Sequence, residues 1–255
     1  MSDPTQLGDV SINIENSIAT IEFSHPLSNS LPGRVLAKLA QTITDAGNNP
    51  EVNVLIVKSA GDRAFCGGAS FDELLSIDSK ETGLTFFSGF ANVINAARKC
   101  PKLIIGRVQG KAVGGGVGLA SAFDYTMATK FASVKLSELA VGIGPFVVGP
   151  AVERKMGLSA MSELAINAGE FRTAEWARQK GLYTYIFDSA EELDAEVAKL
   201  AETLAKSSPE AMMELKKIFW AGTEHWDELL AERAGISGRL VLSDFTKNFI
   251  QNFKK

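Results

Sequence analysis

Residue types that mark several common protein classes are scarce in this chain of 255 residues. It has two cysteines, Cys66 and Cys100, which are too few for a disulfide framework and form no CxxC pair. It has two histidines, His25 and His225, so a histidine-rich metal site and an HExxH motif are excluded. Neither histidine lies near a recognisable serine nucleophile. We therefore predict no metal site and a reduced, cytoplasmic protein.

A basic excess and a long hydrophobic segment are missing as well. Lys and Arg total 26 against 30 Asp and Glu, which gives a formal net charge of −4. Proteins that bind nucleic acid normally carry more positive charge, so we expect no nucleic-acid partner. The longest uncharged apolar run, residues 139–152, is interrupted by glycine and proline and is too short to cross a bilayer. We expect no membrane segment.

Residues 1–188 alternate predicted strands and helices, which is typical of an α/β fold with a largely parallel core. The first strands alternate apolar and polar residues on either side of Asn16 and Ser17, as in a β-hairpin. The predicted strands after the hairpin cover residues 52–57, 103–105, 125–128 and 133–136, and the helices begin at Pro32 and cover 71–77 and 86–97.

Residues 189–255 have helical periodicity throughout. Ser189 and Glu192 form a predicted capping box, and Ser208 precedes a proline at the start of another helix. We interpret residues 1–188 as an α/β core and 189–255 as a helical C-terminal region. Its last helix carries a stripe that we expect to pack on the core or on a neighbouring subunit, made of Phe245, Phe249 and Phe253.

Two segments rich in small residues each follow a buried strand and lead into a helix. The first is AFCGGAS, residues 64–70, and the second is GGGVG, residues 114–118. Small residues allow a ligand to approach the backbone closely, and a helix N-terminus offers unpaired N–H groups. The second segment fits neither GxGxxG nor a phosphate-binding loop. The alternatives are an oxyanion hole built from both segments or simple close packing of helix on strand.

Glu138 lies immediately before the long apolar run, residues 139–152. Burial at such a boundary would raise its pKa toward the range that suits proton transfer. The alternative is a glutamate that faces solvent at the start of a helix.

The segments AFCGGA (64–69), VQGKAVGGG (108–116) and LSEL (136–139) together resemble the crotonase (enoyl-CoA hydratase/isomerase) superfamily. The resemblance covers residues 10–255 and is strongest over 52–145. It implies a spiral of repeated ββα units with a helical C-terminal trimerisation region. It also implies a homotrimer or homohexamer.

The resemblance implies an acyl-CoA thioester substrate, with coenzyme A entering as part of the substrate and no separate cofactor. Backbone N–H groups of Ala69 and Gly115 would hold the thioester oxygen, and Glu138 would be the catalytic acid and base. Lysines near the chain end are candidates for the coenzyme A phosphates by location alone, namely Lys247, Lys254 and Lys255. The residues implied to bind substrate or coenzyme A are Leu27, Ala64, Phe65, Gly67, Gly68, Gly114 and Phe146.

The sequence departs from the family pattern at the second catalytic carboxylate. Family hydratases commonly carry a glutamate where this chain has Gly118. A single glutamate suits Δ3,Δ2-enoyl-CoA isomerases, whereas hydration would need a substitute acid, of which Asp72 and Glu73 are the nearest by sequence. Hydration and double-bond isomerisation both stay open. A catalytically idle acyl-CoA-binding protein is the alternative from another functional class.

The family's glycine-rich turn is replaced by GPFVVG, residues 144–149. Phe146 also stands where dienoyl-CoA isomerases of the family carry a further acid. We therefore predict an apolar acyl pocket that is narrowed near Phe146.

Overall fold

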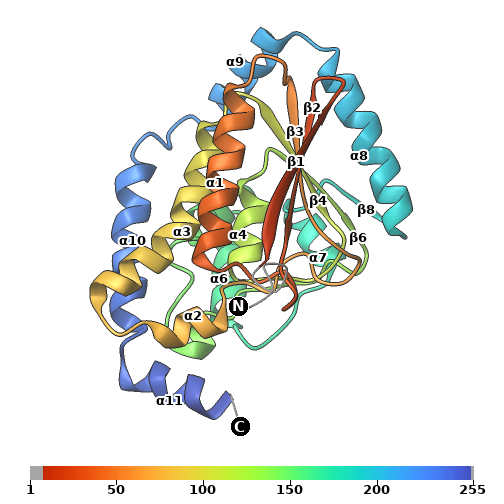
Figure 1. Ribbon diagram of the computed structural model, residues 1–255. Helices are drawn as coiled ribbons and strands as arrows, with labels where there is room; N and C mark the ends of the chain where they lie inside the picture. The colour runs from red at the N-terminus through yellow and green to blue at the C-terminus, as the bar shows by residue number, and fades with distance from the viewer. Residues whose placement is uncertain (1–7, 254–255) are drawn as a thin grey trace.

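A six-stranded sheet forms the centre of the molecule (Figure 1). The computed structural model describes residues 8–253, with side chains described as far as residue 249. The strand order is β1-β2-β3-β4-β6-β8, and every neighbouring pair is parallel except β1 with β2. This confirms the predicted α/β fold. The strands are β1 (Asp9–Glu15), β2 (Ile18–Ser24), β3 (Val54–Ser59), β4 (Leu103–Val108), β6 (Tyr125–Thr129) and β8 (Tyr185–Phe187).

The predicted hairpin is confirmed at β1 and β2. Asn16 and Ser17 have φ values of 51° and 63°, as a two-residue turn matched to strand twist requires. The apolar face of β2 is buried, but its partners Ile12 and Ile14 on β1 remain 44% and 39% exposed. They share that face, yet β1 is the edge strand, so part of their surface faces solvent.

Helices cover both faces of the sheet (Figure 1). On one side lie α1 (Gly33–Asn48), α3 (Lys80–Lys99) and α4 (Gly115–Ala122), with α10 (Trp226–Leu240) packed outside α3. On the other side, α8 (Ala190–Ala205) lies across β3, β4, β6 and β8. The boundary at residue 188 thus falls between the last strand and the helix that covers the second face.

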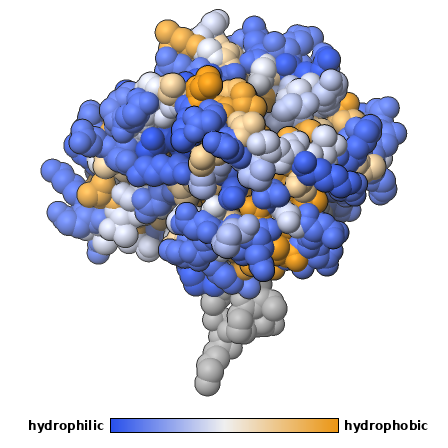
Figure 2. Space-filling model, turned by 90° about the horizontal axis from the view of Figure 1, so that it is seen from above, coloured by the Kyte–Doolittle hydropathy of each residue, from blue (hydrophilic) through white to orange (hydrophobic). Residues whose placement is uncertain are grey.

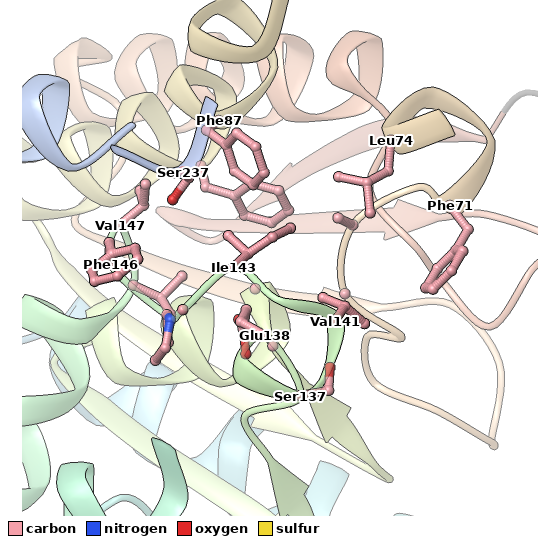
Figure 3. A pocket seen from close by; sticks show the side chains of 18 of the residues that line it. Phe71, Leu74, Phe87, Ser137, Glu138, Val141, Ile143, Phe146, Val147 and Ser237 are labelled. Carbon is pink, nitrogen blue, oxygen red and sulfur yellow. The ribbon is translucent and has the colours of Figure 1, made fainter. Parts of the chain in front are cut away.

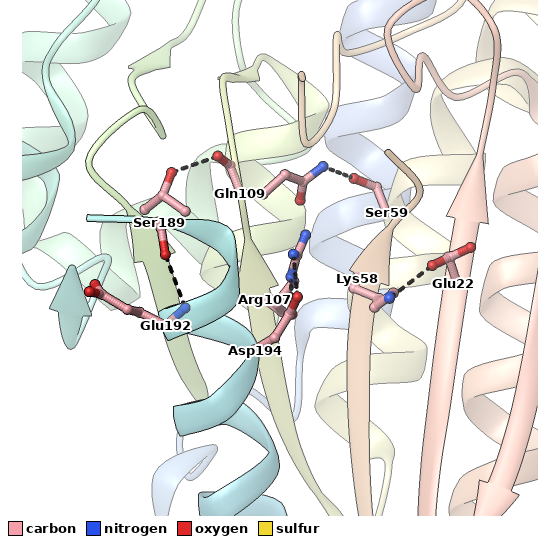
Figure 4. A network of polar contacts seen from close by, with 9 residues as sticks. Glu22, Lys58, Ser59, Arg107, Gln109, Ser189, Glu192 and Asp194 are labelled. Carbon is pink, nitrogen blue, oxygen red and sulfur yellow. Dashed lines mark hydrogen bonds and ion pairs between the residues drawn. The ribbon is translucent and has the colours of Figure 1, made fainter. Parts of the chain in front are cut away.

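Polar contacts fix α8 on the sheet (Figure 4). Arg107 of β4 is nearly buried and binds both carboxylate oxygens of Asp194, with Nε–Oδ1 and Nη2–Oδ2 distances of 2.7 and 3.0 Å. The Ser189 hydroxyl accepts a hydrogen bond from the Glu192 backbone N–H, as the sequence predicts. The Glu192 carboxylate accepts from the N–H of Asp188 rather than from that of Ser189.

A second layer of short strands lies beside the main sheet. It contains β5 (Ala112–Val113) and β7 (Val134–Lys135), extended by single bridges from Leu31 to Ala69, Cys66 to Ala112 and Val134 to Arg172. Each repeat therefore runs from a long strand through a short segment of this layer into a helix. This arrangement confirms the spiral of ββα units that the resemblance implies.

The remaining helices connect these repeats and complete the C-terminal region. The helix predicted over 86–97 begins earlier, at Lys80, because Ser79 and Thr82 form a capping box there. The apolar run 139–152 is divided between a 3₁₀ turn, a loop and the start of α5. These elements are α2 (Phe71–Ser76), η2 (Leu139–Val141), α5 (Gly149–Met156), α6 (Leu158–Ile166), α7 (Ala174–Gln179), α9 (Pro209–Phe219) and α11 (Asp244–Phe253).

The hydropathy of the surface and the packing of the last helix are relevant to contacts with membranes and with other subunits. Seen from above, one face is mainly hydrophilic with small scattered hydrophobic groups (Figure 2). None of the described helices combines the length and apolar character needed to cross a bilayer. On α11, Phe245 is 64% exposed while Phe249 packs partly against the core. The Phe253 side chain, Lys254 and Lys255 lie outside the described residues.

A buried ionic cluster joins α9 to the sheet. The Asp124 Oδ2 atom accepts hydrogen bonds from the Ile104 backbone N–H at 2.8 Å and from Lys216 Nζ at 2.6 Å. Its Oδ1 atom accepts one from Trp220 Nε1 at 2.8 Å. The side chains of Asp124 and Lys216 are each 4% exposed. Both oxygens of this buried carboxylate are therefore satisfied by protein donors.

Candidate active site

The two small-residue segments lie side by side because the short-strand layer joins them. Cys66 bridges Ala112, and the N–H of Val113 donates to the Cys66 carbonyl at 2.9 Å. A Cβ placed on Gly68 would lie 3.0 Å from the Val113 carbonyl oxygen and 4.0 Å from the Gly115 nitrogen. Segments 45 residues apart in the chain thus form one site.

Glycine is required at the start of α4 for two physical reasons. Gly114 has φ of 52° and ψ of −115°, a conformation that side chains disfavour. Gly115 faces Phe90 so closely that a Cβ would lie 2.1 Å from the Phe90 Cε1 atom. A side chain on Gly115 would therefore displace the aromatic ring or the backbone of the loop.

The N–H groups of Ala69 and Gly115 remain available at this junction. No described residue accepts a hydrogen bond from either of them. Gly115 is the first residue of α4, where the N–H has no partner within the helix. Both residues line the same cavity, so both backbone donors are available to a ligand there.

The cavity beside these donors is mainly apolar (Figure 3). It holds about 670 Å³ of empty space, and the opening to solvent is included in that volume. Glu138 is the only ionisable side chain among the described residues that line it. The lining residues are Gly67, Gly68, Ala69, Phe71, Leu74, Phe87, Phe90, Gly114, Gly115, Ser137, Glu138, Val141, Ile143, Gly144, Pro145, Phe146, Val147, Val148 and Ser237.

Glu138 points into this cavity from the turn that follows β7 (Figure 3). A Cβ on Gly114 would lie 2.9 Å from Glu138 Oε1, which places the carboxylate against the loop that carries Gly115. Its Oε2 atom is buried and has no hydrogen-bond partner. Burial raises the pKa of Glu138 to about 7, and a hydrogen bond with its own backbone N–H acts in the opposite direction. The carboxyl group is therefore suited to both accepting and releasing a proton near neutral pH.

The position of the missing second carboxylate is filled by another residue. A Cβ on Gly118 would lie 2.5 Å from Val148 Cγ1 and 2.6 Å from Val148 Cβ. Val148 is 4% exposed and lines the cavity. Val148 thus occupies the space that a side chain at residue 118 would need.

The two acids that could replace the missing carboxylate, Asp72 and Glu73, lie outside the cavity. Glu73 Oε2 accepts a hydrogen bond of 2.7 Å from the Gly33 N–H at the start of α1. Asp72 is exposed. Neither is among the described residues that line the cavity.

The residues implied to bind substrate divide into two groups. Gly67, Gly68, Gly114 and Phe146 line the cavity with Ala69, Gly115 and Glu138. The other three lie outside its lining: Leu27 is 63% exposed, Phe65 is fully buried, and the Ala64 carbonyl accepts from Asn29 and Gln109 side chains. Lys247 is exposed on α11.

Several residues that line the cavity could not be predicted from the sequence. Phe90 and Ser237 come from α3 and α10, and nothing in helical periodicity distinguishes a residue that faces a cavity from one that faces the core. Gly118 does indicate that another side chain packs at this position, because glycine leaves space for a neighbour, and that neighbour is Val148. Among residues 8–253 no group of three His, Cys, Asp or Glu is placed to hold a metal ion.

Known proteins resemble this chain over nearly its whole length. A probable enoyl-CoA hydratase of Bacillus subtilis (strain 168) is 26% identical over 246 residues, which cover 96% of this chain and 95% of the relative. A peroxisomal Delta(3,5)-Delta(2,4)-dienoyl-CoA isomerase of Arabidopsis thaliana is 28% identical over 228 residues, covering 83% and 80%.

Solved structures agree with the fold. The crystal structure of an enoyl-CoA hydratase from Bacillus halodurans gives a TM-score of 0.87 at 21% identity and covers 95% of this chain and 99% of that one. The family described as enoyl-CoA hydratase/isomerase matches residues 13–246, a range that includes both small-residue segments and Glu138. This chain therefore belongs to the enoyl-CoA hydratase/isomerase family, part of the crotonase superfamily.

Proposed function

We propose that this protein is an acyl-CoA enzyme in which Glu138 is the single acid and base. The N–H groups of Ala69 and Gly115 hold the thioester oxygen, and the reaction moves or hydrates the double bond of a 2- or 3-enoyl-CoA. Coenzyme A enters as part of the substrate. The observation that carries the proposal is a buried, unpartnered carboxylate oxygen in the same cavity as two free backbone donors.

The chemistry follows from these three groups. The Glu138 carboxylate removes a proton from the carbon α to the thioester, and the electron pair of that C–H bond moves toward the carbonyl oxygen. The two N–H groups stabilise the charge that develops there; removing one such donor typically lowers the rate 10²- to 10³-fold. Protonated Glu138 then returns the proton to the γ carbon, which leaves a conjugated 2-enoyl thioester.

Isomerisation is favoured over hydration by the packing at Gly118. Addition of water to the double bond is easier with one acid to supply the α proton and one base to activate the water. Val148 occupies the place of a second carboxylate, and no other acid lines the described cavity. Hydration remains the second candidate, because the Bacillus subtilis relative is a probable enoyl-CoA hydratase.

The acyl end of the cavity is apolar and is bounded by Phe146, whose ring packs directly over Gly144. A second hollow, lined in part by Leu158, Met161 and Trp226, lies behind the same phenylalanine. We infer that Phe146 limits acyl length. Chain-length profiling of the wild type would contradict this inference if long straight chains react best, and Phe146→Ala should shift the optimum to longer chains.

The assembly belongs to the proposal too. A homotrimer or homohexamer formed with the helical region 189–255 fits the exposed apolar residues of that region, which include Ile218, Phe219 and Phe245. Light scattering of the purified protein tests this directly, and a monomer at micromolar concentration contradicts it.

The test of the reaction uses crotonyl-CoA and a 3-enoyl-CoA, with wild type beside Glu138→Gln. A gain of conjugated absorbance from the 3-enoyl substrate alone supports the isomerase. A loss of crotonyl-CoA absorbance supports hydration instead. If neither substrate reacts while acyl-CoA binds equally to both proteins, the catalytically idle binding protein replaces the proposal.

A further inference from the structure

Three polar side chains lie among the described residues that line the cavity: Ser137 and Glu138, which are adjacent in the chain, and Ser237, which comes from a distant helix. Ser237 of α10 lines the cavity although the residue is only 1% exposed. Figure 3 shows it beside Phe87 and above Phe146, across the cavity from Phe71 and with its oxygen directed away from its helix. Phe71 is 39% exposed, so it marks the open side and Ser237 the enclosed side.

The Ser237 hydroxyl has no hydrogen-bond partner among the described residues. Serines within helices usually donate to the carbonyl four residues earlier, as Ser121 does toward Val117 at 2.8 Å. Ser237 makes no such bond to Arg233. Buried polar groups are rarely left unpaired. We therefore expect a molecule bound in the cavity to form a hydrogen bond with this hydroxyl.

The packing of α10 on α3 holds Ser237 in this place. Gly83 and Gly238 meet so closely that a Cβ on Gly83 would lie 2.8 Å from the Gly238 Cα atom. The helix therefore cannot turn to direct residue 237 elsewhere without separating the two backbones.

The surroundings define what kind of group the hydroxyl would meet. None of the described lining residues is Lys, Arg or His, so a carboxylate on the acyl chain would be desolvated without a counter-charge. It would also be repelled by ionised Glu138. A neutral oxygen needs no counter-charge and is not repelled by Glu138.

We propose that Ser237 determines acyl specificity by forming a hydrogen bond to a neutral hydroxyl or carbonyl oxygen on the acyl chain. This inference rests on the proposed function, because it assumes that the cavity holds an acyl-CoA. A plain alkyl chain would enclose the Ser237 hydroxyl without a partner, and the enzyme would discriminate against it.

The test is a binding measurement that needs no turnover. Dissociation constants are measured by titration calorimetry for hexanoyl-CoA and for its derivatives with a hydroxyl at carbon 4, 5 or 6. For wild type, at least one derivative should bind roughly 3- to 10-fold more tightly than hexanoyl-CoA, as one net hydrogen bond allows. Ser237→Ala should abolish this preference.

The control variant is Ser162→Ala. The Ser162 hydroxyl donates to the Ser159 carbonyl outside the cavity, so this variant should keep the preference. An equal preference in wild type and Ser237→Ala, or none in wild type, overturns the inference. If no thioester binds at all, both the inference and the proposed function fail. If Ser237→Ala loses the preference while no enoyl-CoA reacts, the inference stands and only the proposed reaction fails.

Discussion

Two buried carboxylates in this protein have opposite surroundings. Asp124 receives hydrogen bonds from a backbone N–H, from the Lys216 ammonium and from the Trp220 indole. Glu138 Oε2 is buried with no partner at all. Burial costs an ionised carboxylate its hydration; Asp124 recovers that loss from three protein donors, whereas Glu138 has a hydrogen bond with its own backbone N–H only. The comparison indicates that Asp124 stabilises the fold, whereas the unpaired Glu138 oxygen agrees with the proton transfer proposed for it.

The largest expected effect is loss of activity on replacing the unpartnered carboxylate. Glu138→Gln keeps the size of the side chain but cannot accept the α proton, so kcat/KM for a 3-enoyl-CoA should fall about 10³-fold. Steady-state kinetics with the folded variant measure this. A variant that retains more than a tenth of wild-type activity would remove Glu138 from the mechanism.

The matched substitution at the partnered carboxylate should act on stability instead. Asp124→Asn leaves the Lys216 ammonium buried without a counter-charge, which should lower the free energy of unfolding by about 3–5 kcal/mol. Urea unfolding checks this, and kcat per folded molecule should stay near that of wild type. Wild-type stability in the variant would mean that the ionic cluster does not hold α9 on the sheet.

The next largest effect is expected at the backbone donors that share the cavity with Glu138. Gly115→Ala places a Cβ against the Phe90 ring, so the Gly115 N–H should move and kcat should fall about 10²- to 10³-fold. The double variant with Phe90→Leu provides space and should recover part of the loss. Full activity of Gly115→Ala alone would show that this N–H does not bind the thioester oxygen.

The smallest effect concerns how stability depends on pH. The pKa of Glu138 is raised in the folded state from 4.5 to about 7, so the folded protein binds more protons than the unfolded chain between these values. Wild-type stability should therefore fall as pH rises from 4.5 to 7, by on the order of 1–3 kcal/mol. Below pH 4.5 the carboxyl is protonated in both states and the penalty is absent.

Glu138→Gln lacks this titration and serves as its own control. It should be more stable than wild type at pH 8 and equally stable at pH 4, as measured by thermal or urea unfolding at both pH values. A difference that does not change with pH would mean that Glu138 is ionised at no cost in the folded protein.

Much of the fold can be predicted from the sequence because local patterns determine it. The turn at Asn16 and Ser17, the buried strands and the Ser189 cap each depend on neighbouring residues. The short strands β5 and β7 have two residues each, too few for a periodic pattern. Their positions depend on pairing across the second layer, which the sequence of one segment does not contain.

The candidate site divides in the same way. The small-residue segments and Glu138 are visible because glycine clusters and a carboxylate beside an apolar run are unusual locally. Val148 over Gly118, Phe90 against Gly115 and Ser237 in the cavity are contacts between distant segments. Only the packed structure brings them together.

The central claim is that Glu138 removes a proton from the carbon α to a bound thioester. The most direct measurement is the exchange of α hydrogens of a saturated acyl-CoA in deuterated water, followed by mass spectrometry, for wild type and Glu138→Gln. The account predicts deuterium uptake at the α carbon with wild type, rising with pH up to about 7 as Glu138 ionises, and none above background with the variant. Equal uptake in both proteins, or none in wild type while the thioester binds, would contradict it.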